Sequence, residues 1–261
     1  MTHIPVTVIG AGNLAWSLIP ALQAAGISSL QLISRNAEQL QAFQDAYGPL
    51  QIESNLDRVS QDSVLVFLTV SDQAVQEVAT ALKDQVAQHS LVVHCSGSTP
   101  LSALNLLRVR TGVFYPLQTF TKDKVVSFQQ VPLFLEGSPG VLASLRPLAE
   151  SLSEKVFSLA SEDRLRMHLG AVIANNFSNL LYQIAAAQLP SVEGMDFRVY
   201  EALIREHIDK VFEFLPHQTQ TGPARRGDEG TMQQHLDLLQ PHPEIQALYR
   251  SLSEMIQQRH P

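Results

Sequence analysis

The sequence contains a single cysteine, Cys95, among its 261 residues. One cysteine excludes a disulfide within the chain and a zinc site built on cysteine ligands. No neighbouring residue favours a thiolate, so we interpret Cys95 as a buried structural residue rather than a nucleophile. The sequence also lacks any run approaching the roughly 18 apolar residues of a membrane-spanning helix. No basic segment, apolar stretch and cleavage site follow one another at the N-terminus, and we expect a soluble, cytoplasmic protein without a membrane partner.

Charged residues are scarce as well, at 16% of the chain. The 18 Lys and Arg residues against 25 Asp and Glu residues give a net charge of −7, and no stretch is rich in Lys or Arg. This balance excludes a general nucleic-acid binder. So few charges favour an obligate oligomer, because a monomer must cover its whole surface with solvated side chains.

The first part of the chain, up to about residue 158, alternates short β-branched runs with helical stretches. Continuous apolar runs such as VLVFL are typical of strands that are covered on both faces, as in a parallel sheet. The predicted strands are 6–10, 30–34, 64–69, 91–95, 112–117 and 131–137. Strand–helix alternation of this kind predicts an α/β, Rossmann-like, doubly wound and mostly parallel sheet over residues 1–158.

The second part, residues 159–261, has no strand-like run after Phe157. Prolines separate four predicted helices, at 163–189, 196–215, 229–239 and 243–259. This pattern predicts an all-helical C-terminal domain for substrate binding and dimerisation. A sheet domain followed by a helical domain favours a cleft between them, where small-molecule sites form.

A glycine-rich turn follows the first predicted strand. Gly10, Gly12 and Ala15 have the spacing G-x-G-x-x-A between a strand and a helix, which is the dinucleotide-binding pattern. The pyrophosphate of a dinucleotide would lie at the helix N-terminus, where backbone N–H groups are free. We predict that Gly10, Gly12, Asn13 and Leu14 hold it.

The end of the second predicted strand indicates which dinucleotide is bound. An NAD site has an Asp or Glu about 20 residues after the glycines to bind the ribose hydroxyls. Here the strand ends in Ser34, Arg35 and Asn36, with no acid. An arginine beside hydroxyl and amide donors suits the 2′-phosphate of NADP. The alternative interpretation is that Arg35 is a solvated residue at the start of a helix.

The ends of the later strands supply further candidates, because ligands of open α/β sheets bind at the carboxyl ends of strands. Val70 and Ser71 should lie near the ribose and nicotinamide of the cofactor, and Ser96 and Gln118 near the substrate. Tyr115 could donate a proton, although a tyrosine in a strand is more often a packed aromatic with a satisfied hydroxyl.

Several segments together resemble a known family. They are VIGAGNLAWSL, ISRN, LTVSD, HCSGS, GVFYPLQTF, MHLGAVIANNF and TGPARRGDEGT. The chain resembles the NADP oxidoreductase family that joins a Rossmann-like domain to a C-terminal helical domain of unknown function. It is similar, more distantly, to pyrroline-5-carboxylate reductase, ketopantoate reductase and the 6-phosphogluconate/β-hydroxyacid dehydrogenases. The resemblance implies hydride transfer with NADPH, a helical domain over the nicotinamide and a homodimer formed through that domain.

One departure from these relatives concerns the catalytic group. The β-hydroxyacid dehydrogenases carry a lysine four residues before an asparagine on the long helix. In this chain Asn175 and Asn176 are present, but Ala171 and Val172 occupy the lysine positions. His168 is the nearest titratable substitute.

The long helix has two stripes. Leu165, Leu169, Val172, Ile173, Phe177, Leu180 and Ile184 form an apolar face that we expect to be buried. His168, Asn175, Asn179 and Tyr182 run beside it. We predict that His168 is the acid/base group and that Asn175 orients the substrate, and we assign structural roles to Asn179 and Tyr182. The alternative is a satisfied polar seam at a helix–helix or subunit interface.

TQTGPARRGDEGT, residues 219–231, gathers donors beside glycines. Arg226 could bind a carboxylate or phosphate of the substrate with two hydrogen bonds. The alternative is a surface loop in which Asp228 caps the next helix and pairs with an arginine.

We therefore expect an NADP-dependent oxidoreductase that acts on a C=O or C=N group of a small anionic metabolite, with no metal. Two alternatives remain at this point. One is a sensor or partner protein that binds NADP(H) without chemistry, and the other is hydride exchange between a deazaflavin and NADP.

Overall fold

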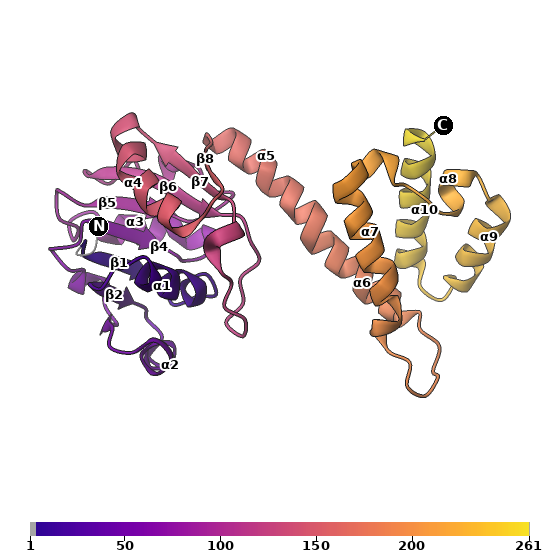
Figure 1. Cartoon of the computed structure of the whole chain (residues 1–261), viewed down its shortest axis with the longest axis horizontal. Coiled ribbons are helices and arrows are strands. Elements are labelled where there is room, and N and C mark those ends of the chain that lie inside the picture. Colours follow the sequence, from indigo (N-terminus) through magenta and orange to yellow (C-terminus); the bar gives the residue numbers. More distant parts are fainter. Residues whose placement is uncertain (1–3, 261) are drawn as a thin grey trace. The chain divides into compact units, whose positions relative to one another are not determined.

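The structure is a computed structural model that describes residues 4–260. Its first part forms an eight-stranded sheet in the order β3-β2-β1-β4-β5-β6-β7-β8 (Figure 1). The strands are β1 Val6–Ile9, β2 Leu30–Ile33, β3 Gln51–Glu53, β4 Leu65–Leu68, β5 Leu91–His94, β6 Arg110–Pro116, β7 Leu133–Gly137 and β8 Val156–Ser158. Neighbouring strands are parallel except for β6 and β7, which are antiparallel. The predicted Rossmann-like, mostly parallel sheet is confirmed.

Two strands, β3 and β8, escape prediction from the sequence. Each has three residues and forms one edge of the sheet. Their side chains are exposed or only partly buried, so neither segment shows the apolar run that marks the central strands. The interior strands β1, β2, β4 and β5 are buried at every position.

Helices cover both faces of the sheet. They are α1 Ala15–Ala24, α2 Ala37–Tyr47, α3 Val75–Leu82 and α4 Pro139–Leu152. On one face of the sheet, Val8, Phe67 and the strand side chains on the same side pack with α1, α2 and α4 in one core cluster. On the other face, Ile9, Leu68 and the strand side chains on that side pack with α3 in a second cluster. Because successive side chains of a strand point to opposite faces, the fully apolar strands supply both clusters.

The remaining chain is helical. The segments are α5 Ser161–Ala171, a π-helical segment Val172–Phe177, α6 Ser178–Ala187, α7 Glu201–Phe214, α8 Pro223–Arg226, α9 Glu229–Leu238 and α10 Pro243–Arg259. The helix predicted over 163–189 is therefore three segments in succession. In a π-helix each turn holds more residues than in an α-helix, so the stripe expected through His168 and Asn175 does not continue unbroken.

The apolar face predicted for the long helix is not buried in this chain. Leu165, Leu169, Ile173, Phe177 and Leu180 are each at least 50% exposed. The prediction was wrong on this point because periodicity identifies an apolar stripe but not the surface that covers it.

The chain divides into two compact units, Met1–Ala174 and Asn175–Pro261. The last strand ends at Ser158, where the sequence places the domain boundary, but the structural division falls later, inside the π-helical segment. The reason is that α5 is tied to the sheet by its own side chains, as Arg164 and Met167 show.

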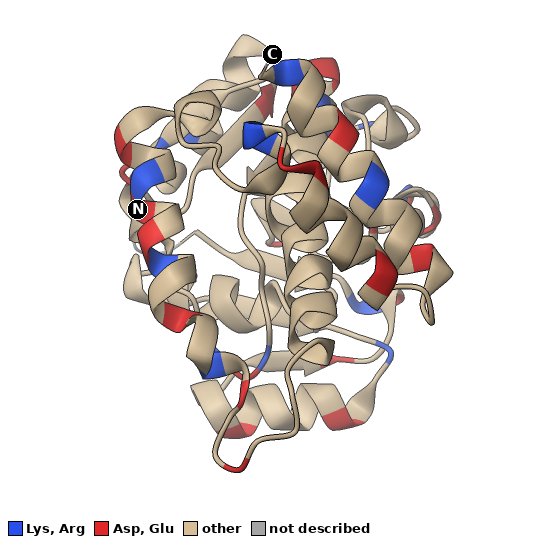
Figure 2. Ribbon diagram, turned by 90° about the vertical axis from the view of Figure 1, so that its right-hand side faces the viewer, with Lys and Arg blue, Asp and Glu red and all other residues tan. Residues whose placement is uncertain are grey.

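The helical unit has little core of its own. Among its described residues, the buried hydrophobic side chains are Ala224, Leu236 and Leu239, while Phe212 is 85% exposed and Leu203 68%. None of the helices within residues 4–260 is long and apolar enough to cross a membrane. Charges are sparse along the chain, with long uncharged stretches of ribbon between them (Figure 2).

Candidate functional site

The turn after β1 has the geometry of a phosphate-binding loop. Gly10 has φ 111°, a conformation that favours glycine, and its N–H donates to the Ile33 carbonyl at 2.8 Å. A Cβ at Gly10 would lie 2.9 Å from the carbonyl carbon of Thr69, so a larger residue is excluded. The Thr69 hydroxyl donates to the Gly10 carbonyl at 2.7 Å, which joins the ends of β1 and β4.

A cavity of about 380 Å³ opens beside this turn. Of the residues predicted to bind the cofactor, those that line it are Gly10, Gly12, Ser34, Arg35, Asn36, Val70 and Ser71. Asn13 and Leu14 do not line it; Asn13 is exposed at the turn, and Leu14 packs against the core at the start of α1. The cavity lies between β1, β2 and β4, where the strand order reverses, which is where dinucleotides bind in this fold.

Arg35 marks the end of the cavity at β2. Its side chain is 88% exposed, and its nearest charged partner is Glu77, 4.0 Å away and 74% exposed. Asn36 caps α2, because its side-chain oxygen accepts from the Gln39 N–H at 3.0 Å, and its own N–H donates to the Ser34 hydroxyl. Arg35 thus keeps its guanidinium free for an anion, whereas Asn36 also serves as the helix cap.

The loop after β5 is folded by its own side chains. The Ser96 hydroxyl accepts from the N–H groups of Ser98 and Thr99 and donates to the Thr99 hydroxyl at 2.8 Å. Ser96 is only 5% exposed, so its hydroxyl is committed to the loop. The Ser98 hydroxyl donates to Asp72, which connects this loop to the one after β4.

His168, on α5, lies against this loop. Its Nδ1 is 3.1 Å from the Tyr115 hydroxyl, and the two rings meet edge to face at 6.1 Å. A Cβ at Gly97 would lie 2.5 Å from His168 Nδ1 and 2.8 Å from the Tyr115 hydroxyl oxygen, so the pair fits only because residue 97 is glycine. Burial raises the pKa of Tyr115 to about 12, with a smaller contribution from the charge of Asp72, and the phenol keeps its proton.

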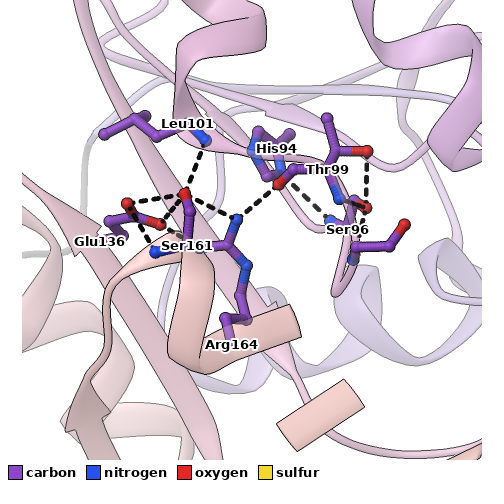
Figure 3. A network of polar contacts seen from close by, with 8 residues as sticks. His94, Ser96, Thr99, Leu101, Glu136, Ser161 and Arg164 are labelled. Carbon is purple, nitrogen blue, oxygen red and sulfur yellow. Dashed lines mark hydrogen bonds and ion pairs between the residues drawn. The ribbon is translucent and has the colours of Figure 1, made fainter. Parts of the chain in front are cut away.

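A buried ion pair joins Arg164 to Glu136 (Figure 3). Arg164 lies one helical turn before His168 on α5. Arg164, on α5, is 1% exposed; it donates to the Glu136 carboxylate, from β7, and to the Thr99 carbonyl. Glu136 also accepts from the N–H of Ser161 at 3.0 Å and from its hydroxyl at 2.8 Å. This cluster was not predicted from the sequence, where the available signal was an acid at the end of an otherwise apolar strand, VPLFLEG.

Two residues at the end of β5 have shifted pKa values. His94 is fully buried and accepts from the Ser96 N–H at 3.2 Å; burial and the charge of Arg164 lower its pKa to about 4. Cys95 is partly buried rather than fully buried as expected, but its surroundings raise the pKa of the thiol above its usual range, which disfavours a nucleophilic thiolate.

Three further predicted site residues are Gln118, Asn175 and Arg226. Gln118 is exposed beyond β6, where its side-chain oxygen accepts from the Thr119 N–H. Asn175 lies in the π-helical segment, and Arg226 is the exposed last residue of α8; both belong to the helical unit. Asp228 caps α9 through the N–H and hydroxyl of Thr231, as the alternative interpretation of that loop expects. The described part of the chain shows no group of three or more His, Cys, Asp or Glu residues that could hold a metal ion.

Comparison with known proteins agrees with this geometry. Residues 5–97 match the family model "NADP oxidoreductase coenzyme F420-dependent", and residues 131–256 match a domain of unknown function (DUF2520). Pyrroline-5-carboxylate reductase of Pseudomonas aeruginosa is 33% identical over 101 residues, which are 38% of this chain and 37% of that enzyme, so the match spans little more than a third of its length.

Two solved structures extend the comparison to the whole chain. An imine reductase of Streptomyces aurantiacus, 14% identical, shares the fold with a TM-score of 0.72 over 97% of this chain and 93% of its own. A proposed NADP oxidoreductase of Bacteroides fragilis is 35% identical over 98% of this chain and 99% of its own, with a TM-score of 0.91. This chain therefore belongs to that family of NADP-dependent oxidoreductases, in which a Rossmann-like domain precedes a helical domain of unknown function.

Proposed function

We propose that the protein is a cytoplasmic reductase that uses NADPH to reduce a C=N or C=O group of a small anionic metabolite. The observation that carries the proposal is the placement of His168, held by Tyr115 against Gly97, at the edge of the sheet that also forms the cofactor cavity. The partial match to pyrroline-5-carboxylate reductase, whose named substrate is a cyclic imine with a carboxylate, favours C=N over C=O.

The cavity fits the cofactor in two respects. The glycine turn leaves no room for a Cβ at Gly10, and Arg35 presents an exposed guanidinium beside Ser34 in the lining of the cavity. We propose that Gly10, Gly12, Asn13 and Leu14 hold the pyrophosphate and that Arg35 binds the 2′-phosphate, with Ser34 and Asn36 beside it. When bound, the cofactor supplies the hydride.

His168 supplies the proton in this proposal. The Tyr115 hydroxyl can donate to Nδ1 or accept from it, so Nδ1 stays occupied in either protonation state of the imidazole. Nε2 is then the nitrogen that faces the substrate. A protonated His168 gives its Nε2 proton to the nitrogen or oxygen of the reduced bond and takes one back from solvent.

Further residues are candidates for substrate binding. We propose that Arg226 holds the anionic group of the substrate and that Asn175 orients it, with Gln118 at the end of β6 as a further polar contact. Ser96 contributes through the shape of its loop, because its hydroxyl is used there. We also propose a homodimer formed through the helical unit, which the exposed apolar side chains of that unit support.

The cofactor assignment is tested by titrating the protein with NADPH and with NADH while following nicotinamide fluorescence. In Arg35→Ala we expect NADPH to bind about 10- to 100-fold more weakly, the range of one charge-assisted phosphate contact, with NADH little changed. Arg108→Ala, at an exposed arginine outside the cavity, is the matched control. Failure of the wild-type protein to bind either nucleotide would refute the oxidoreductase proposal.

The catalytic assignment is tested with His168→Ala once a screen of small imino and oxo acids has found a substrate. Loss of the general acid should lower kcat by about 10²- to 10⁴-fold while NADPH binding persists. His89→Ala, at an exposed histidine away from the site, should leave kcat unchanged. A wild-type protein that binds NADPH but reduces nothing in the screen would favour the sensor alternative.

One observation favours a second candidate, hydride exchange between a deazaflavin and NADP. The family model that matches residues 5–97 names coenzyme F420, which is a deazaflavin. Oxidised F420 added with NADPH would then lose its visible absorbance in the presence of the protein. An unchanged absorbance would leave the imine or carbonyl reductase.

A further inference from the structure

We infer that the buried Arg164–Glu136 pair is the positioning device of the active site, which sets His168 against Tyr115 and Gly97. The inference rests on the proposed role of His168 as proton donor. All the residues involved belong to the sheet unit, and they connect three elements, β7, the loop after β5 and the first turn of α5 (Figure 3).

First, the start of α5 is held by a side chain from β7. A helix begins with free N–H groups, which a side chain at the N-cap position usually satisfies. The N-cap residue of α5 is Ala160, which has no such side chain. Glu136 takes its place from the neighbouring strand by accepting the Ser161 N–H, and its negative charge lies at the positive end of the helix dipole. The direction in which α5 leaves the sheet is therefore set by Glu136.

The second step concerns the loop after β5. Arg164 donates to the carbonyl of Thr99, and the Ser161 hydroxyl accepts from the N–H of Leu101 at 3.0 Å. The same loop contains Gly97, which lies against the His168 ring. Arg164 thus fixes the distance between the helix that carries His168 and the loop on which His168 packs.

The third step follows from helix periodicity. Residues four apart lie on the same side of an α-helix, one turn from each other. Arg164 and His168 are such a pair, and both lie within α5 before the π-helical segment begins. A shift of Arg164 is therefore passed to His168 with little loss.

The energetics point the same way. A buried ion pair gains little net stability, because desolvation of the two charges offsets their attraction, and apolar residues of similar volume are often as stable. Apolar residues cannot supply directed hydrogen bonds to the Thr99 carbonyl and the Ser161 N–H. The pair therefore contributes geometry that packing alone does not.

The test compares the double variant Arg164→Met/Glu136→Leu with wild type. We expect the double variant to fold with a moderate loss of thermal stability, because no charge is left buried but the Ser161 N–H and the Thr99 carbonyl lose these partners. NADPH affinity should stay within about twofold, because the cofactor cavity is untouched. We expect kcat to fall by about 10- to 100-fold with KM within about threefold, because misplacement of a catalytic group costs turnover rather than binding. The surface pair of α4, replaced in Arg146→Met/Glu150→Leu, is the matched control.

A second readout requires no substrate. ¹⁵N spectra of histidine-labelled protein, with the His168 signals among the nine histidines identified by His168→Gln, report the hydrogen bond at Nδ1. The double variant should lose the wild-type Nδ1 signal. The Nδ1 signal can be measured even if the wild-type protein reduces no substrate. Failure of the proposed function is therefore distinguishable from failure of the inference.

A third variant covers the case in which the double variant does not fold. Arg164→Lys keeps the charge opposite Glu136 but cannot bond Glu136 and Thr99 together with two guanidinium nitrogens. We expect it to shift the His168 Nδ1 signal and to lower kcat by about 5- to 30-fold. A wild-type His168 signal in every variant that folds would overturn the inference.

Discussion

The sheet unit uses two of its arginines, Arg35 and Arg164, in opposite ways. Arg35, at the end of β2, is 88% exposed and has only a loose contact with Glu77. Arg164, at the start of α5, is 1% exposed and donates hydrogen bonds to the Glu136 carboxylate and to the Thr99 carbonyl. An arginine that is to bind a ligand must keep its guanidinium available, whereas one that fixes a backbone directs its terminal nitrogens to groups inside the protein.

The same contrast predicts different consequences of substitution. An exposed pair such as Arg35–Glu77 contributes about 0–1 kcal/mol to stability, so changes there should alter ligand affinity alone. Removal of one partner of a buried pair costs about 3–5 kcal/mol, because the other charge is left without compensation. Substitution of Arg164 or Glu136 should therefore alter the stability of the fold, the position of His168 and the pH dependence of stability together.

The largest effect that we predict concerns acid stability. His94 beside Arg164 has a pKa of about 4 in the folded protein, below the ordinary histidine value of 6.5, so the unfolded chain binds the extra proton first as the pH falls. The free energy of unfolding should be unaffected by this group above pH 6.5 and should fall by about 3 kcal/mol between pH 6.5 and pH 4. Urea titrations across that range measure it.

The control for this prediction is His94→Asn, which keeps an acceptor for the Ser96 N–H but does not titrate. Its stability should fall less steeply between pH 6.5 and pH 4 than that of wild type. Equal slopes for the two proteins would show that His94 does not carry the dependence.

The next effect concerns the fit between the loop after β5 and α5. Gly97→Ala would place a Cβ 2.5 Å from His168 Nδ1, and because Tyr115 is buried behind it, the imidazole must move. We expect kcat to fall by about 100-fold, as for other displacements of a catalytic group by about 1 Å, with NADPH affinity retained. Steady-state kinetics and the fluorescence titration measure the two quantities.

Gly140→Ala is the matched control, because a Cβ at Gly140 meets nothing within 4 Å. It should preserve kcat. A Gly97→Ala enzyme with wild-type turnover would mean that the contact of His168 with this loop has no catalytic importance.

The smallest effect that we predict concerns the exposed pair Arg35–Glu77. Glu77→Gln removes a carboxylate 4.0 Å from Arg35 that competes with, and repels, a bound 2′-phosphate. We expect NADPH to bind about two- to fivefold more tightly at low salt, with the gain reduced at high salt and with NADH unaffected. Glu150→Gln, in the comparable surface pair of α4, should change neither affinity.

The sequence was sufficient to predict six of the eight strands of the sheet and seven of the residues that line the cavity beside the glycine turn. The central strands are continuous apolar runs, and the glycine spacing and Arg35 are local signals that need no knowledge of distant contacts. The Arg164–Glu136 pair joins residues 28 apart in sequence, and each alone resembles an ordinary charged residue at the end of an element. Nothing in either segment indicates that the other is its partner.

The long helix shows a second limit of sequence reasoning. The stripe through His168 and Asn175 assumes an unbroken α-helix, whereas Val172–Phe177 is π-helical. The segment VIANNF has no proline or glycine to mark the change. Its apolar neighbours were predicted to be buried and are exposed, because the stripe alone does not reveal which surface is to cover it.

The single cysteine, Cys95, makes the end of β5 accessible to a chemical rate measurement without an introduced probe. Cys95 is the residue between His94 and the loop that holds His168, and burial disfavours its thiolate, which is the form that reacts with disulfide reagents. Cys95 is partly exposed, but modification by such a reagent should be slow because little thiolate is present, and its rate would report changes around the end of β5 in the unaltered protein. Because the chain has no second thiol, every modified molecule carries the reagent at Cys95.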